Sequence, residues 1–396
     1  MRGAPRRLPA LVAVLAALVL GAPAAATAEP PRLEARAWVL IEARSGEVLA
    51  SHAASQRLPV ASTTKLMTAY VALRELSLRM TVEASPYAAL LGESLLELQP
   101  GDEVSVRDLL YGLILRSGND SAVDLALATS GSVRRFVTEM NRYAAALGLA
   151  GTHYANPIGL DHEGNYSNAL DLAALARRLL RDPAFARIAD SRSAVLRSLR
   201  PPRRIETLND FLLAVPWATG VKTGHTNGAA YVLVGSGRRK GVELISAVLG
   251  APSEASRDGE TLELLEHGFA LYRKRLPVRA GEALATPSIR YSGDELTLRA
   301  ARSVAVGVRR GRRLRVAVRA PGEVEGPIRR GARLGRALVS VDGRRVAAVP
   351  LRAGRGVAEA STLDKLRSFL GDKALWLVLA LSAILVGAVL GRRLIR

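Results

Sequence analysis

The chain has 396 residues, of which 49% are hydrophobic and 23% charged, as expected for a folded protein of about two domains. It contains no cysteine, which excludes disulfides, thiol nucleophiles and cysteine metal ligands. The five histidines have no spacing typical of a metal site, so we expect neither a metal nor a cofactor.

Positive charge is concentrated in one segment. The formal net charge is +20, and residues 273–358 contain 21 basic residues against six acidic ones. Tyr291 is the only aromatic residue there, which disfavours base stacking, so we expect no nucleic-acid partner. An anionic lipid or an anionic wall polymer is the better candidate partner. The alternative is a basic surface without a partner.

The two ends of the chain have the features of membrane-targeting segments. Residues 1–28 combine early arginines, an apolar run and a small-residue cleavage site, which predicts a signal peptide. Residues 374–391 are apolar and long enough to span a bilayer, and the arginines of 392–396 predict a cytoplasmic tail. Residues 359–373 are expected to form an amphipathic juxtamembrane linker. We therefore predict an exported protein that is held in the cell membrane by a single C-terminal helix.

Between these ends the pattern predicts two domains. Residues 29–272 begin with a strand hairpin over 37–43 and 48–52 and continue mainly as helices. Further strands are expected over 229–235 and 241–250. Residues 273–358 alternate in short apolar runs split by Gly and Pro, which predicts a small β-sandwich-like domain. The helices of the first domain are expected at 64–76, 106–115, 121–129, 132–147, 169–181 and 256–269, with a short one opened by Asp182-Pro183.

Ser62 and Lys65 form the first candidate site. They are three residues apart where a loop leads into a helix, so their side chains share one face. Serine needs a base, and an amine can serve when burial or nearby positive charge lowers its pKa. Only six of the 56 basic residues are lysines, and arginine cannot be deprotonated. This spacing also arises by chance roughly once or twice in a chain of this length. On its own, the pair is therefore no more than a candidate nucleophile and base.

Two later motifs add to this pair. Ser117-Gly118-Asn119 is a polar loop between two apolar helices, and the next residues, Asp120 or Ser121, are natural N-caps for the second helix. Lys222-Thr223-Gly224 lies at a strand edge and uses another of the few lysines.

Taken in order, the three motifs resemble those of the penicillin-recognising serine acyltransferases. The Ser-Gly-Asn form, the Lys-Thr-Gly-His-Thr-Asn run, the later Ser-Arg-Asp at 256–258, the β domain and the C-terminal segment resemble the D-alanyl-D-alanine carboxypeptidases. These are low-molecular-mass penicillin-binding proteins of peptidase family S11. The resemblance covers about residues 34–269. It implies an α/β (α+β) core like that of serine β-lactamases, with an antiparallel sheet built from both ends of the domain, flanking helices and a helical lobe.

The resemblance also implies roles for the motif residues. Ser62 would attack the carbonyl between the two terminal D-alanines of a peptidoglycan stem peptide, and penicillins would acylate the same serine. Lys65 would be the base, Ser117 would relay a proton, and Lys222 would adjust the pKa values. The backbone N–H groups of Ser62 and His225 would form the oxyanion hole.

Substrate binding is implied for a second group of residues. Asn119 would hold the peptide amide, and Thr223 would bind the terminal carboxylate within the strand that includes Gly224 and His225. Arg257 would assist with that carboxylate. The residues before it, 250–252, depart from the glycine-rich sequence expected of the family.

Two other functions stay open. A β-lactamase of the same fold would need a deacylation base. Glu139, Glu163 and Glu206 are the only glutamates between the second and third motifs, and their contexts do not single one out. The second alternative is a penicillin sensor or wall-binding scaffold that is acylated without turnover.

Overall fold

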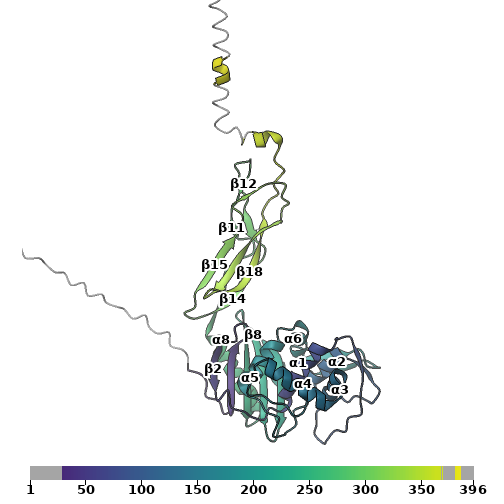
Figure 1. Ribbon diagram of the computed structural model, residues 1–396. Coiled ribbons are helices and arrows are strands. Elements are labelled where there is room, and N and C mark those ends of the chain that lie inside the picture. Colours follow the sequence, from purple (N-terminus) through teal and green to yellow (C-terminus); the bar gives the residue numbers. More distant parts are fainter. Residues whose placement is uncertain (1–28, 367, 369–379, 385–396) are drawn as a thin grey trace, which may run out of the picture.

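The computed structural model describes residues 29–366, 368 and 380–384. Helices and a sheet form the N-terminal domain, and an elongated set of strands, the β domain, extends from one end of it (Figure 1). The predicted signal peptide of residues 1–28 and the tail of residues 392–396 lie outside the described residues.

A five-stranded antiparallel sheet runs through the N-terminal domain in the order β2-β1-β9-β8-β7. The central pairing of β1 with β9 joins the two ends of the domain, which confirms the expectation from the resemblance. The bounds are β1 Ala37–Glu42, β2 Val48–His52, β7 Ala218–Thr226, β8 Ala230–Arg239 and β9 Val242–Ala251.

Both faces of this sheet are covered, as its long apolar strands require. Successive side chains of a strand point to opposite faces. Val39 and Ile41 of β1 join the core that contains the helical lobe, whereas Trp38 and Leu40 pack with α8 on the other face.

The helices predicted from the sequence are observed to within a few residues, and the short helix over Asp210–Ala214 was not predicted. Ser62 lies in a short 3₁₀ turn, η1, which continues into α1. Asp120 and Ser121 are not N-caps, because α3 begins at Asn119 and its N-cap is Gly118. The bounds are η1 Ala61–Thr64, α1 Lys65–Glu75, α2 Val106–Leu115, α3 Asn119–Ser130, α4 Val133–Ala146, α5 Ala169–Leu179, α6 Pro183–Ala189, α7 Asp210–Ala214 and α8 Glu254–Ala270. Two small sheets accompany them: β3 Thr81–Glu83 with β4 Glu103–Ser105, and β5 Ser193–Leu196 with β6 Arg203–Glu206.

The β domain has its own apolar core, which includes Leu298, Val339 and Leu351. Its main sheet has the order β11-β13-β18-β17-β15, and β10 pairs with β14 where the two domains meet. All regular elements described within residues 273–358 are strands, as predicted. The bounds are β10 Tyr272–Val278, β11 Ala283–Ala285, β12 Ser288–Ile289, β13 Leu298–Ala300, β14 Val304–Arg309, β15 Leu314–Arg319, β16 Glu323–Val324, β17 Arg333–Val341 and β18 Arg344–Ala353.

Beyond the β domain, residues 362–366, 368 and 380–384 are helical. Among the residues that the structure describes, none of the helices has both the length and the apolar character needed to cross a membrane. Most of the predicted span of residues 374–391 lies outside the described residues.

Candidate active site

Ser62 and Lys65 meet at the junction of η1 and α1. Residues three apart in a 3₁₀ turn lie one above the other, and the Lys65 Nζ lies 3.1 Å from the Ser62 Oγ. The same Nζ donates a 2.6 Å hydrogen bond to the carbonyl of Ile158. Lys65 is completely buried, whereas Ser62 is partly exposed. A reachable hydroxyl is therefore held against a buried amine.

The surroundings of Lys65 favour its neutral form. Burial, the largest effect, lowers the pKa of the Lys65 amine well below its usual value, and the positive charge of Lys222 lowers it further. Glu93 and Asp120 act in the opposite direction. The base role implied by the resemblance requires this neutral amine, and burial contributes more to it than the second lysine does.

Lys222 lies on β7, 2% exposed, and its Nζ donates to the Thr223 carbonyl at 2.8 Å. Burial and the nearby Arg257 lower the pKa of Lys222 to about 7. Arg257 is itself 2% exposed, and it pairs with the carboxylates of Asp258 and Glu254, each at 2.8 Å. The charge of Arg257 thus acts on Lys222, while the Arg257 guanidinium is already paired with two carboxylates.

The Ser-Gly-Asn loop is held in an uncommon conformation. Ser117 is buried and has φ +58°, a left-handed value that non-glycine residues seldom adopt and that is found at functional sites. The backbone N–H of Asn119 donates to the Ser94 carbonyl at 2.8 Å, and its side-chain Nδ2 donates to the Glu93 Oε2 at 2.7 Å. Asn119 therefore joins the site to a segment that the motifs did not include.

That segment, residues 84–98, contains residues that sequence reasoning missed. Glu93 accepts hydrogen bonds from the Tyr87 hydroxyl and the Leu90 backbone as well as from Asn119. Burial alone would raise the pKa of Glu93, but the hydrogen bonds from Tyr87, Asn119 and the Leu90 backbone and the charge of Lys65 together lower it. Glu93 is therefore an anion near Lys65. No periodicity or motif in the sequence marks it.

Asp120 has a structural role in the same region. Its carboxylate accepts from the backbone N–H groups of Leu96 at 2.9 Å and Leu98 at 3.2 Å. The residue expected to cap a helix instead fastens residues 96–98 to the start of α3.

Two glycines allow the chain to pass close to Ser62. A Cβ on Gly224 would lie 3.0 Å from the Ser62 backbone nitrogen, so β7 lies directly against η1. A Cβ on Gly159, where φ is +92°, would lie 2.0 Å from the Ala61 carbonyl oxygen. On β7, Thr223 is partly exposed and His225 is exposed.

The loop of residues 156–161 closes the site from another side. It supplies the Ile158 carbonyl to Lys65, and the Thr68 hydroxyl donates to Pro157 at 2.6 Å. At its far end, Asp161 accepts from the Thr226 hydroxyl at 2.6 Å and so fastens the end of β7. Asn156-Pro157 is a turn signal in the sequence, but nothing there indicates a contact with Lys65.

Known proteins resemble this chain over most of its length. The family profile described as D-alanyl-D-alanine carboxypeptidase, peptidase S11, matches residues 24–253. The chain is 34% identical over 361 residues to D-alanyl-D-alanine carboxypeptidase DacC of Escherichia coli, covering 87% of this chain and 89% of that one. It is 30% identical to DacF of Bacillus subtilis, covering 86% and 90%. The crystal structure of penicillin binding protein 6B from Escherichia coli superimposes with a TM-score of 0.61 at 28% identity, over 82% of this chain and 97% of that one. With three motifs gathered around one buried lysine and relatives matched over most of its length, the chain belongs to the S11 family of D-alanyl-D-alanine carboxypeptidases.

Proposed function

We propose that the chain hydrolyses the terminal D-Ala-D-Ala bond of peptidoglycan stem pentapeptides through an acyl-enzyme on Ser62. The observation that carries this proposal is the buried Lys65 amine, 3.1 Å from the Ser62 hydroxyl and with a lowered pKa. Lys65 takes the hydroxyl proton as Ser62 Oγ attacks the carbonyl carbon. The negative charge that develops on the carbonyl oxygen is met by the backbone N–H groups of Ser62 and His225.

The tetrahedral intermediate then loses D-alanine. Ser117 passes a proton to the leaving amine, and Lys222, with a pKa of about 7, adjusts this transfer. The carbon–nitrogen bond breaks and the acyl-enzyme forms. Water then attacks the ester, which releases the shortened peptide and restores the Ser62 hydroxyl.

Substrate binding divides between two sides of the site. Asn119 holds the peptide amide, with its own amide group oriented by Glu93. Thr223 binds the terminal carboxylate on β7, beside Gly224. Arg257 supports that carboxylate site through the electrostatic environment of Lys222, since its guanidinium already pairs with Glu254 and Asp258.

Penicillins acylate the same serine in this proposal, as the name of the matched penicillin binding protein suggests. The β-lactamase alternative receives no support from its three candidate bases. Glu139 pairs with Arg142 on α4, Glu206 pairs with Arg204 on β6, and Glu163 is exposed.

We further propose that the protein works outside the cytoplasm. The signal peptide of residues 1–28 exports it, and a helix over residues 374–391 anchors it in the cell membrane with residues 392–396 inside. The basic β domain then stands between the anchor and the catalytic domain, where it can face anionic lipid or wall polymer.

The test uses the full chain beside Ser62→Ala, with Ser55→Ala, an exposed serine on the preceding loop, as the matched control. Each protein is incubated with a fluorescent penicillin and, separately, with a D-Ala-D-Ala pentapeptide. We expect covalent labelling and D-alanine release in wild type and Ser55→Ala, and neither in Ser62→Ala. Label that persists in Ser62→Ala would refute the acyl-serine mechanism. Labelling without D-alanine release would favour the sensor, and rapid penicillin turnover would favour the β-lactamase.

A further inference from the structure

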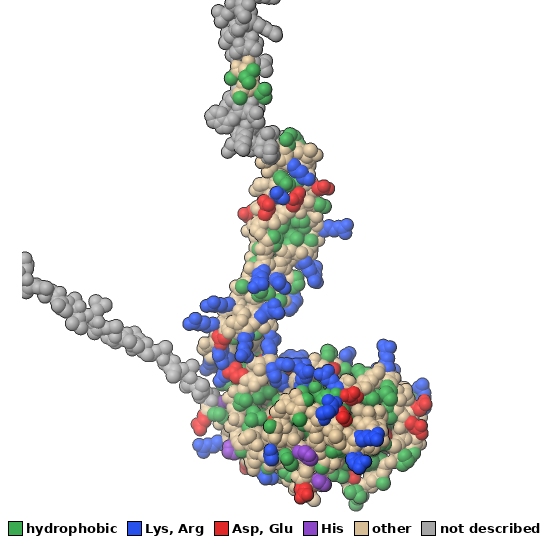
Figure 2. Space-filling model, in the orientation of Figure 1, with side chains coloured by type: hydrophobic (Ala, Val, Ile, Leu, Met, Phe, Trp, Pro, Cys, Tyr) green, Lys and Arg blue, Asp and Glu red, His purple; other side chains and the backbone are tan. Residues whose placement is uncertain are grey.

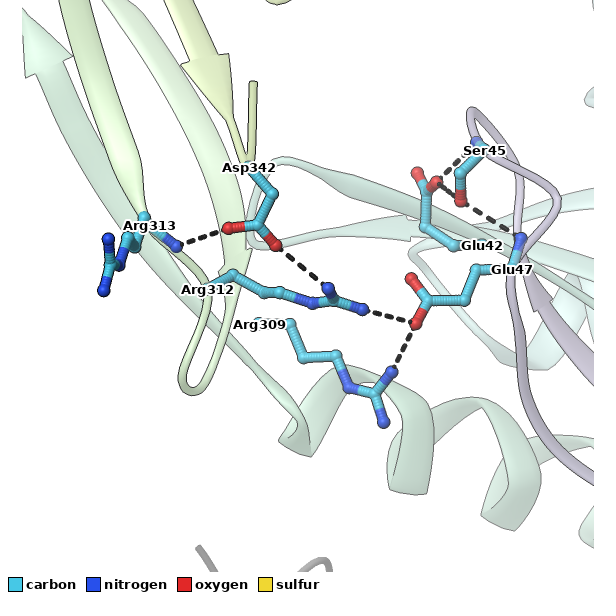
Figure 3. A network of polar contacts seen from close by, with 7 residues as sticks. All are labelled: Glu42, Ser45, Glu47, Arg309, Arg312, Arg313 and Asp342. Carbon is cyan, nitrogen blue, oxygen red and sulfur yellow. Dashed lines mark hydrogen bonds and ion pairs between the residues drawn. The ribbon is translucent and has the colours of Figure 1, made fainter. Parts of the chain in front are cut away.

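A large cleft opens where the two domains meet. Its volume is about 1030 Å³, and its lining comes from the β1–β2 turn, the end of α5, the β8–β9 turn and the β14–β15 and β17–β18 turns. Figure 3 shows one wall, in which Glu47 of the N-terminal domain faces Arg309 and Arg312 of the β domain. Seven arginines and four carboxylates line this cleft.

The carboxylates of the cleft are already engaged. Glu47 pairs with Arg309 at 2.8 Å and with Arg312 at 2.9 Å, and Asp342 pairs with Arg312 at 3.0 Å (Figure 3). Glu42 accepts hydrogen bonds of 2.6 Å from the backbone and the hydroxyl of Ser45. The remaining one, Glu243, pairs with Arg238 at 3.0 Å.

In the described part of the chain, the guanidinium groups of five of the seven arginines, by contrast, form no ion pair with a carboxylate: Arg44, Arg177, Arg181, Arg344 and Arg345. Arg177 donates to the carbonyls of Ala43 and Arg44, each at 2.8 Å, and Arg44 donates to the Val346 carbonyl across the domain boundary. Burial and the neighbouring Arg181 lower the pKa of Arg177, and the charge of Glu42 acts in the opposite direction. Figure 2 shows Lys and Arg side chains gathered over this junction.

Such a cluster favours a ligand with concentrated negative charge. A guanidinium binds oxyanions through a planar fork of donors and stays charged at all relevant pH values. A carboxylate fills one such fork, whereas a phosphate group has enough acceptor oxygens to meet several. The cleft supplies arginines from two directions, which suits the larger anion.

We propose that the cleft binds a phosphate-bearing ligand, held by Arg177 and Arg181 of the N-terminal domain and by Arg344 and Arg345 of the β domain. The ligand would bridge the two domains beside the Glu47 ion pairs.

This site is separate from the catalytic one. Lys222 pairs with Val234 on β8, and the cleft begins beyond the end of β8, at Gly241 and Val242. At about 3.3 Å per residue, the two sites are roughly 25 Å apart along the sheet. Loss of the phosphate site should therefore leave peptide hydrolysis unchanged.

The test measures inorganic phosphate binding to the full chain in a neutral detergent by titration calorimetry, with acetate at equal ionic strength as the comparison anion. The variant is Arg344→Gln/Arg345→Gln. The matched control is Arg329→Gln/Arg330→Gln, an equal charge change at two exposed arginines outside the cleft. We expect saturable phosphate binding that weakens about tenfold or more in the first pair and stays unchanged in the control, with D-alanine release normal in both.

Absence of saturable phosphate binding, equal binding of acetate, or an equal loss in the control pair would overturn the proposal. The source of the phosphate follows from a second arm, in which the chain is reconstituted in vesicles of digalactosyldiacylglycerol, a lipid that carries no phosphate, with or without phosphatidylglycerol. If a lipid headgroup occupies the cleft, added phosphate will raise the Tm only in vesicles without phosphatidylglycerol. If the ligand is a free phosphate compound, the increase will be the same in both.

Discussion

The active site and the domain junction use positive charge in opposite ways. Lys65 and Lys222 are almost fully buried and have lowered pKa values, so their environment works against their charge. At the junction Arg309 is partly exposed and Arg312 is exposed, and both are paired with Glu47.

This difference explains the choice of residue at each place. A general base must be deprotonated before it can accept a proton. A buried lysine readily reaches this neutral form, whereas arginine does not. A tether or an anion site needs a lasting charge and several donors, which arginine supplies. The chain, in which only six of 56 basic residues are lysines, places two of the six in the active site.

Lys65→Arg should have the largest effect, because it replaces the active-site lysine with arginine, the cation that the domain junction uses. Arginine retains the positive charge but cannot accept the Ser62 proton, so we expect the penicillin acylation rate to fall by about 10³-fold. Stopped-flow or gel-based labelling measures this rate. The control is Lys240→Arg, an exposed lysine outside the active site. An acylation rate within tenfold of wild type in Lys65→Arg would rule out Lys65 as the base.

Gly159→Ala tests the packing that brings Ser62 to its lysine. The new Cβ would lie 2.0 Å from the Ala61 carbonyl oxygen at a φ of +92°, so we expect about 3 kcal/mol of destabilisation and a large loss of acylation. Gly131→Ala is the matched control, since it also has a positive φ, +71°, but meets nothing within 4 Å. It should cost only about 1 kcal/mol and leave acylation unchanged. Equal costs in the two variants, by denaturant unfolding, would show that the contact with Ala61 is unimportant.

Burial of Lys222 also makes a prediction about pH and stability. Its pKa is about 7 in the folded state, against 10.5 for the exposed amine. Between these values the unfolded chain binds the proton and the folded chain does not, so the contribution of Lys222 to stability rises with pH from about 7 to 10.5. The slope should be at most about 1.4 kcal/mol per pH unit.

Lys222→Met should remove that rise, whereas Met at the exposed Lys274 should not. The measurement is the free energy of unfolding at several pH values across the window, compared between wild type and each variant. A wild-type and Lys222→Met difference that stays constant with pH would contradict the lowered pKa.

The smallest effect is expected at the junction. Glu47→Gln removes partly exposed ion pairs, which usually contribute less than about 1 kcal/mol, and this loss should be greater at low ionic strength than at high. Unfolding at two salt concentrations measures it, and acylation of Ser62 should stay normal. A change in the acylation rate would indicate that the junction communicates with the active site.

Much of the geometry of the candidate active site could be predicted from the sequence because its residues lie in short motifs. Ser62 and Lys65 are one turn apart, and local spacing alone brings them together. The effect of Lys222 on Lys65 followed only from the resemblance, and the burial of Lys222 was not predicted.

The contacts that hold the site in place were not predictable. Glu93 and Ile158 reach Asn119 and Lys65 from loops distant in sequence, one by a side chain and one by a carbonyl. Every residue has a backbone carbonyl, so the residue type of Ile158 does not indicate its contact with Lys65. A single glutamate in an irregular segment, such as Glu93, cannot be distinguished by sequence from an exposed surface charge. Asp120 was misread for a related reason. An aspartate at this position is expected from local sequence to cap the helix, but the Asp120 carboxylate instead accepts a hydrogen bond from Leu96, which is distant in sequence.

The central claim is that the surroundings of Lys65 lower the pKa of its amine, so that the neutral amine can act as the base. The most direct measurement is the pH dependence of Ser62 acylation by penicillin in wild type, Lys222→Met and Glu93→Gln. Lys222 lowers the pKa of Lys65 and Glu93 raises it, so removing each charge should shift the pKa in opposite directions. The account predicts that the acid limb moves to higher pH in Lys222→Met and to lower pH in Glu93→Gln. Acid limbs that stay in place, or that move in the same direction, would contradict it.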